Sequence, residues 1–170
     1  LRGNSARCIL VCVYGNRAYE DTLVELKDIA RDSGFQTATA VSAMAEHSIM
    51  RQYATGRPDE KDIEELQGFA ETIFEKLAAG KLTASAPELP GNRPYKKAGG
   101  AGLVPKADKK CIGCGLCAKS CPAQAIDPKS LKTADGKKCI SCMRCVVKCP
   151  ESARKVNSAM VSAATLALKK

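Results

Sequence analysis

Two runs of four cysteines are the feature that most constrains how this chain can fold. In both runs the spacing is Cys-x2-Cys-x2-Cys-x3-Cys, and proline follows the last cysteine. The first run spans residues 111–121, and its four cysteines recur 28 residues later, at 139–149. This is the spacing of [4Fe-4S] cubane sites, in which three thiolates of a run bind one cluster and the fourth binds the other cluster. The sequence therefore predicts an electron carrier with two clusters.

The spacing also predicts which cysteines share a cluster. The ligands of one cluster are expected to be Cys111, Cys114, Cys117 and Cys149. The ligands of the other cluster are expected to be Cys139, Cys142, Cys145 and Cys121. Neither run contains histidine, which favours ordinary low-potential cubanes over a Rieske centre. Lys119, Arg144 and Lys148 are expected to raise the reduction potentials, because positive charge favours the reduced cluster.

The two runs differ in their glycines. Gly113 and Gly115 separate the first three cysteines of the first run, where they permit a close approach of the backbone and a positive φ. Ser141 and Met143 stand at these places in the second run. The second loop must therefore fold without glycine.

Zinc is the alternative metal for these cysteines. Cys-x-x-Cys pairs commonly build structural zinc sites with four thiolates, and such sites usually have a longer loop between the two pairs. Three cysteines at strict intervals of three, followed by Cys-Pro and then repeated, favour iron and sulfur. Analysis of iron and acid-labile sulfide separates the two alternatives.

Cysteine usage and hydropathy limit the compartment. The chain has 10 cysteines and no secretory signal, which argues against a disulfide scaffold. Cys8 and Cys12 lie outside the two runs and are expected to be small buried hydrophobic residues. No stretch approaches the roughly 18 to 20 apolar residues of a membrane span. The sequence predicts a soluble protein in a reducing compartment, the cytoplasm.

The net charge of +9 is unevenly distributed. Residues 1–90 contain 10 Lys and Arg against 14 Asp and Glu, whereas residues 91–170 contain 17 against 4. Part of this positive charge offsets the clusters, which carry about −2 each when oxidised. The remainder predicts a basic face that attracts a redox partner protein with an acidic docking face. Nucleic acid is disfavoured as a partner, because no aromatic side chains are interleaved with the lysines.

The N-terminal part alternates between strands and helices. Residues 7–14 form an apolar, β-branched run that predicts a strand buried on both faces, as in a parallel sheet. A helix is expected over 19–33, ended by Gly34, and a second strand over 35–41. Another helix is expected over 59–79.

The expected helix over 59–79 has clear boundary signals. Asp59 is the expected N-cap with Asp62 three residues later, and Gly80 is expected to end the helix. Its apolar stripe comprises Ile63, Leu66, Phe69 or Ala70, Ile73 and Leu77.

Domain boundaries follow from composition. Residues 1–80 are expected to be the C-terminal part of a larger α/β domain, because two strands do not make a stable sheet alone and the chain begins at Leu1. The unpaired edge of such a sheet predicts a homodimer through residues 7–42. Four Pro and four Gly mark 81–105 as a linker that wraps along the surface. The cysteine domain is expected at 106–151 and a helical tail at 152–170.

Residues 106–151 resemble the bacterial two-cluster ferredoxins. The resemblance implies a pseudo-twofold βαββαβ unit with a short helix after each three-cysteine loop, at about 118–121 and 146–149. The surface is basic where many such ferredoxins are acidic, so this chain is expected to use different partners.

Nearly the whole chain resembles a prokaryotic family in which a flavodoxin-like domain precedes a two-cluster ferredoxin. The residues that carry this resemblance are Val13–Asp21, Ala45–Ile49 and Gly56–Pro58. It implies that four residues lie where the isoalloxazine edge of FMN is held: Tyr14, Gly15, Asn16 and Tyr19. The phosphate-binding loop of that family is absent here, so FMN is expected only in a longer parent protein.

The expected fold is therefore α+β, with a partial flavodoxin-like βαβα unit followed by a ferredoxin-type two-[4Fe-4S] pseudo-twofold domain. An electron carrier without catalysis of its own is the preferred function. The alternatives are a fragment of a flavin-dependent oxidoreductase, in which the clusters feed an FMN site, and a protein whose clusters only stabilise the fold. His47, the single histidine, is expected to be exposed or locally hydrogen-bonded rather than a proton donor to flavin.

Overall fold

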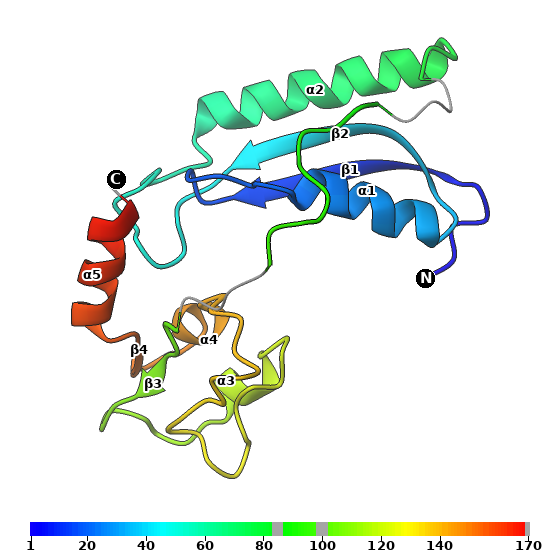
Figure 1. Ribbon diagram of the computed structural model, residues 1–170. Helices are drawn as coiled ribbons and strands as arrows, with labels where there is room; N and C mark the ends of the chain where they lie inside the picture. Colours follow the sequence, from blue (N-terminus) through cyan, green and yellow to red (C-terminus); the bar gives the residue numbers. More distant parts are fainter. Residues whose placement is uncertain (83–86, 98–101, 169–170) are drawn as a thin grey trace. The chain divides into compact units, whose positions relative to one another are not determined.

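The computed structural model describes residues 1–82, 87–97 and 102–168 (Figure 1). The chain is mixed α/β and divides into two compact units. The first unit comprises Leu1–His47 and Arg51–Lys97, and the second comprises Ser48–Met50 and Ala98–Lys170. Parts of the expected linker, 83–86 and 98–101, and the last two residues of the expected tail, 169–170, lie outside the described residues.

Two parallel strands form the sheet of the first unit. β1 (Arg7–Tyr14) pairs with β2 (Gln36–Met44), and α1 (Thr22–Asp32) connects them. The parallel pairing and the order of elements agree with the sequence-based expectation. Gly34, with φ +83°, follows α1 and supports the turn into β2.

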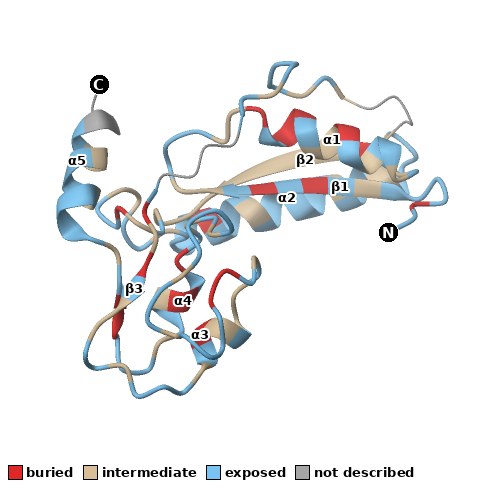
Figure 2. Ribbon diagram, turned by 60° about the horizontal axis from the view of Figure 1, so that its bottom comes forward, coloured by how far each residue is buried: buried red, intermediate tan, exposed pale blue. Residues whose placement is uncertain are grey.

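The prediction that β1 is buried on both faces is wrong. Leu10 and Cys12 are buried, whereas Ile9, Val11 and Val13 are 43%, 55% and 66% exposed. Figure 2 shows the buried segments of β1 between exposed ones. Successive side chains of a strand point to opposite faces, and α1 packs on the face of Leu10 and Cys12, where its Thr22 interacts with Cys12. Self-association through residues 7–42 stays a prediction.

The helix α2 (Glu60–Ala78) begins after the predicted N-cap, Asp59, and the structure adds a capping box with Asp62. The carboxylate of Asp59 accepts from the backbone N–H of Asp62 at 3.0 Å, and the carboxylate of Asp62 accepts from the backbone N–H of Asp59 at 2.8 Å. Gly80, with φ +66°, follows the helix as predicted. The expected stripe is only partly covered, since Ile63 and Phe69 are 48% and 41% exposed. In this unit α2 contacts β2 (Figure 1).

Residues 87–97 of the expected linker bind to α1 and the turn before it. The backbone N–H groups of Asn92 and Lys96 donate to the two carboxylate oxygens of Asp21, each at 2.7 Å. Arg93 donates to Asp28 at 2.7 Å and 2.9 Å, and the Tyr95 hydroxyl donates to the same carboxylate. These donors, Arg93 first, hold the pKa of Asp28 well below its ordinary value. This segment is therefore part of the first unit.

The second unit has short elements. β3 (Lys106–Ala107) pairs antiparallel with β4 (Arg154–Lys155), which lies beyond the boundary expected at residue 151. The helical turns α3 (Leu116–Lys119) and α4 (Arg144–Val147) each begin two residues before the expected positions. A further helix, α5 (Ser158–Leu168), lies within the expected tail. No helix in the described part of the chain has the length and apolar character needed to cross a membrane.

Candidate metal centre

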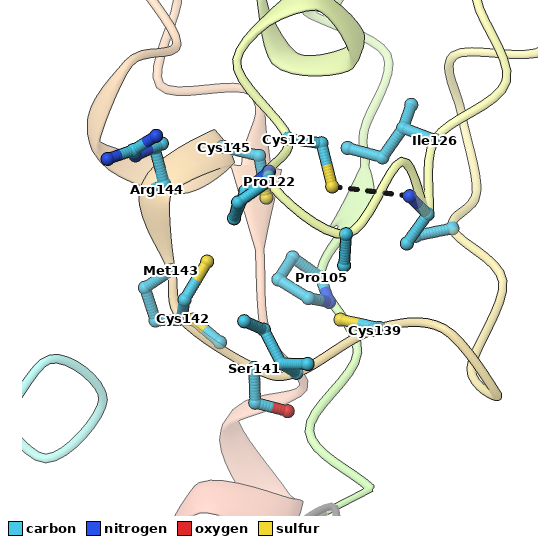
Figure 3. A pocket seen from close by; sticks show the side chains of 14 residues that line it. Pro105, Cys121, Pro122, Ile126, Cys139, Ser141, Cys142, Met143, Arg144 and Cys145 are labelled. Atoms are coloured by element: carbon cyan, nitrogen blue, oxygen red, sulfur yellow. Dashed lines mark hydrogen bonds between the residues drawn. The ribbon is translucent and has the colours of Figure 1, made fainter. Parts of the chain in front are cut away.

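Two pockets of the second unit are each lined by four cysteines. The first pocket is lined by Cys111, Cys114, Cys117 and Cys149. The second pocket is lined by Cys121, Cys139, Cys142 and Cys145 (Figure 3). In both pockets three cysteines of one run meet the last cysteine of the other run. These are the two groups expected from the spacing, and their role as ligands stays a prediction.

The two cysteine loops have the same backbone conformation despite their different residues. Gly113 and Gly115 have φ +73° and +74°, and Ser141 and Met143 at the matching places have φ +53° and +57°. All four are in the left-handed region, which glycine adopts without strain and other residues rarely adopt. The second loop thus folds without glycine by accepting this conformation at Ser141 and Met143.

One hydrogen bond from a backbone N–H orients the last cysteine of each run. The Sγ of Cys121 accepts from the N–H of Ala125 at 3.3 Å, as the dashed line in Figure 3 shows. The Sγ of Cys149 accepts from the N–H of Ala153, also at 3.3 Å. Both contacts have the same spacing along the chain and are 28 residues apart. Donors to a thiolate favour the charged form that a metal ligand needs.

Burial differs among the cysteines of each pocket in a matching way. Cys117 and Cys145 are each 9% exposed and pack with Ile126, whereas Cys114 and Cys142 are exposed. Burial raises the pKa of the Cys145 thiol, and the nearby positive charge of Arg154 acts against this rise. Each pocket therefore has one sulfur in the interior and one at the surface of the unit.

Arg154 is a charged residue of the site that the sequence analysis did not single out. It lines the first pocket, and its Nη1 lies 3.6 Å from the Sγ of Cys117. The 28-residue offset pairs Arg154 with Ile126, an apolar residue. Comparing the two runs beyond their cysteines would have revealed this difference, although not that the arginine is buried.

The donor set of each pocket fits a cluster. Thiolates are the ligands that iron–sulfur clusters use, and each thiolate of a cubane binds a different iron. Four sulfurs around a cubane therefore need not converge on one point. Among the described residues, no three His, Cys, Asp or Glu side chains are arranged to hold a single metal ion.

The residues expected near FMN are only partly brought together. The rings of Tyr14 and Tyr19 meet edge to face, with centroids 5.4 Å apart. Gly15 packs closely on His47, because a Cβ built on Gly15 would lie 3.0 Å from the His47 Cα. A pocket that Tyr14 shares with Arg57, Asp62 and other residues includes neither Gly15, Asn16 nor Tyr19.

Comparison with known proteins identifies the cysteine region. Residues 110–154 match the family described as 4Fe-4S dicluster domain. A stretch of 66 residues is 33% identical to NADH-quinone oxidoreductase subunit I 2 of Rhodopseudomonas palustris (strain BisB18), and it covers 38% of this chain and 39% of that relative. No solved structure matches the chain.

The second unit therefore contains a 4Fe-4S domain of ferredoxin type, a class of domain that transfers electrons. The chain covers well under half the length of the relative that it matches. The flavodoxin-like assignment of residues 1–80 stays a prediction.

Proposed function

We propose that the second unit binds two [4Fe-4S] clusters and passes single electrons between a donor and an acceptor protein. The observation that carries this proposal is the pair of pockets, each lined by three cysteines of one run and one of the other. When bound, a cubane supplies one-electron redox chemistry without a reacting substrate. The protein holds the thiolates, orients them through the N–H groups of Ala125 and Ala153, and keeps part of each sulfur set away from water.

Cross-ligation is the arrangement that we propose within this site. Cys149 would complete the cluster of the first pocket, and Cys121 that of the second. Each cluster would then join the two halves of the repeat, so that cluster binding and folding of the unit are coupled.

Charge supports a redox partner protein with an acidic docking face. The second unit contains 14 Lys and Arg against 4 Asp and Glu. Such an excess raises the rate of association with an acidic protein at low ionic strength. The relative from Rhodopseudomonas palustris is named as a subunit of an NADH-quinone oxidoreductase, which also favours a protein partner. We place this exchange in the cytoplasm, where thiols stay reduced.

Serine substitution of single cysteines tests the ligand assignment. Cross-ligation predicts that Cys121→Ser alters the same EPR signal as Cys139→Ser, and a different signal from Cys111→Ser. Ligation within each run predicts instead that Cys121→Ser and Cys111→Ser alter the same signal. Cys8→Ser is the control, because Cys8 lies in β1 outside both pockets.

A reductive titration tests the electron-transfer function itself. Anaerobic titration with dithionite, followed by visible absorption, is expected to consume about two electrons per chain, one for each cubane. Full reoxidation by an added electron acceptor should follow. Clusters that stay unreduced over the whole accessible range would contradict the proposal and favour a purely structural role.

A further inference from the structure

Arg154 of β4 is a positive charge enclosed by the second unit. The residue is 2% exposed, and its Nη1 and Nη2 donate to the carbonyl oxygens of Leu131 at 2.5 Å and Pro105 at 3.0 Å. Its Nε is buried and has no hydrogen-bond partner among the residues that the structure describes. The guanidinium is thus held by neutral groups and by the sulfur of Cys117.

One acid, Glu151, lines the first pocket together with Arg154, but it is exposed. Within the described part of the chain, no Asp or Glu forms an ion pair with Arg154, and the nearby Asp108 pairs with Lys155. A buried cation without a counter-charge is costly, so a cation in this position needs a negative partner. A cubane with four thiolates, at about −2, is such a partner in the first pocket.

The second pocket is lined by an exposed cation, Arg144, and has no buried cation at the place that matches Arg154. Ile126 occupies the matching place of the first run, is 4% exposed and lines the second pocket. The other basic residues close to the ligands, Lys119, Arg144 and Lys148, are exposed, so water and salt screen their charges. The two pockets are therefore lined by equivalent cysteines but have different electrostatic environments.

We propose that Arg154 sets the order in which the two clusters are reduced, by raising the reduction potential of the cluster in the first pocket above that of the second. This inference rests on the proposed function. Each reduction adds one electron, supplied by a low-potential donor, and takes a cluster from about −2 to about −3 without a proton. The charge of Arg154 also acts on Cys145 of the second pocket. It stabilises the added charge more strongly in the first pocket, because Arg154 lines that pocket, with its Nη1 3.6 Å from the Sγ of Cys117, and does not line the second. The first electron accordingly resides on the cluster of Cys111, Cys114, Cys117 and Cys149.

Three substitutions separate the charge of Arg154 from its packing. In Arg154→Gln the ratio of electron occupancy between the two clusters should change at least tenfold. This corresponds to a change of about 59 mV in the difference between the two reduction potentials, for one-electron couples. Arg154→Lys keeps the positive charge and should retain most of the separation between the potentials. Lys119→Gln removes an exposed charge at the end of α3 and should have a smaller effect than Arg154→Gln. Potentials are read from EPR-monitored redox titrations of the full chain.

The same titrations define the results that would overturn the proposal. An unchanged separation in Arg154→Gln, or an equal loss in Arg154→Lys and Arg154→Gln, would mean that the charge of Arg154 does not order the clusters. A protein without two reducible clusters would contradict the proposed function instead, and iron analysis of the wild type distinguishes that failure.

A measurement on the wild type covers the case in which Arg154→Gln loses its clusters. Paramagnetic NMR of the half-reduced protein, labelled with ¹³C at the cysteine β-carbons, shows which cluster holds the first electron. The proposal is supported if, during reduction, the β-carbons of Cys117 and Cys111 take on the chemical shifts of the reduced state before those of Cys145 and Cys139 do. The reverse order would overturn it.

Discussion

Left-handed backbone conformations determine the shape of both cysteine loops. A residue with a Cβ loses roughly 1–2 kcal/mol in this region. In the second loop this cost is offset in part by contacts, since Met143 is 3% exposed and the Ser141 hydroxyl donates to the Leu103 carbonyl at 3.2 Å. In the first loop Gly113 and Gly115 avoid the cost but make no such contacts.

The glycines of the first loop provide a test at a single residue. Space around Gly113 is open, so Gly113→Ala should destabilise the cluster-bound unit only through its φ of +73°, by about 1 kcal/mol. Gly136→Ala is the matched control, because a Cβ there meets only the Val104 side chain at 3.6 Å and the residue has no positive φ. Denaturant unfolding followed by visible absorption measures both. Equal stabilities of the two variants would contradict the expected backbone effect.

Asp62 makes the stability of the first unit depend on acid pH. Its hydrogen bonds to Arg57, and its role in capping α2, lower its pKa from 3.8 to about 2. The folded state therefore binds this proton less readily than the unfolded state. Its contribution to stability is full above about pH 4 and is lost as the pH falls toward 2.

Unfolding of the first unit by urea between pH 5 and 2 measures this dependence. Asp62→Asn should lower stability at pH 5 and flatten the decline below it. A variant with the same pH profile as the wild type would show that Asp62 does not contribute. Tyrosine fluorescence is the suitable signal, because all four tyrosines, Tyr14, Tyr19, Tyr53 and Tyr95, belong to the first unit.

Among the elements, the segment over 87–97 depends on one glycine. Gly91 has φ +138°, and a Cβ at this position would clash with the Cγ1 of the buried Val24 in α1. Gly91→Ala should therefore displace the segment and destabilise the first unit by about 1–3 kcal/mol.

Gly68→Ala is the control for this substitution. Gly68 lies in α2 with open space around it, so alanine there should stabilise the helix by up to about 1 kcal/mol. Thermal unfolding read by tyrosine fluorescence compares the variants. If Gly91→Ala were as stable as the wild type, the close packing on Val24 would be contradicted.

The elements also show how far the sequence alone reaches. Asp59 and Gly80 act locally, within a few residues, and the bounds of α2 were predictable from them. Burial of β1 was not, because the exposure of Val11 depends on which face α1 covers. Arg154 was missed for the same reason, since a sequence pattern does not show that Leu131 and Pro105 enclose it. The two groups of four cysteines that line the pockets were predictable, because the repeated spacing of the cysteines is itself a sequence feature.

At the scale of the whole molecule, the two units are expected to unfold separately. Each has its own set of internal contacts, and only the second is expected to depend on bound iron. Oxidative removal of the clusters with ferricyanide and EDTA should abolish visible absorption and the fold of the second unit. Tyrosine fluorescence and near-UV circular dichroism of the first unit should persist. Loss of both signals together would mean that the two units fold as one.

The central claim is that the chain binds two cubanes. Iron and acid-labile sulfide analysis of anaerobically purified protein, with EPR of the reduced form, tests it most directly. We expect about eight iron and about eight sulfide per chain, and signals from two interacting reduced clusters. Stoichiometric zinc without sulfide, or iron and sulfide for one cluster only, would contradict this account.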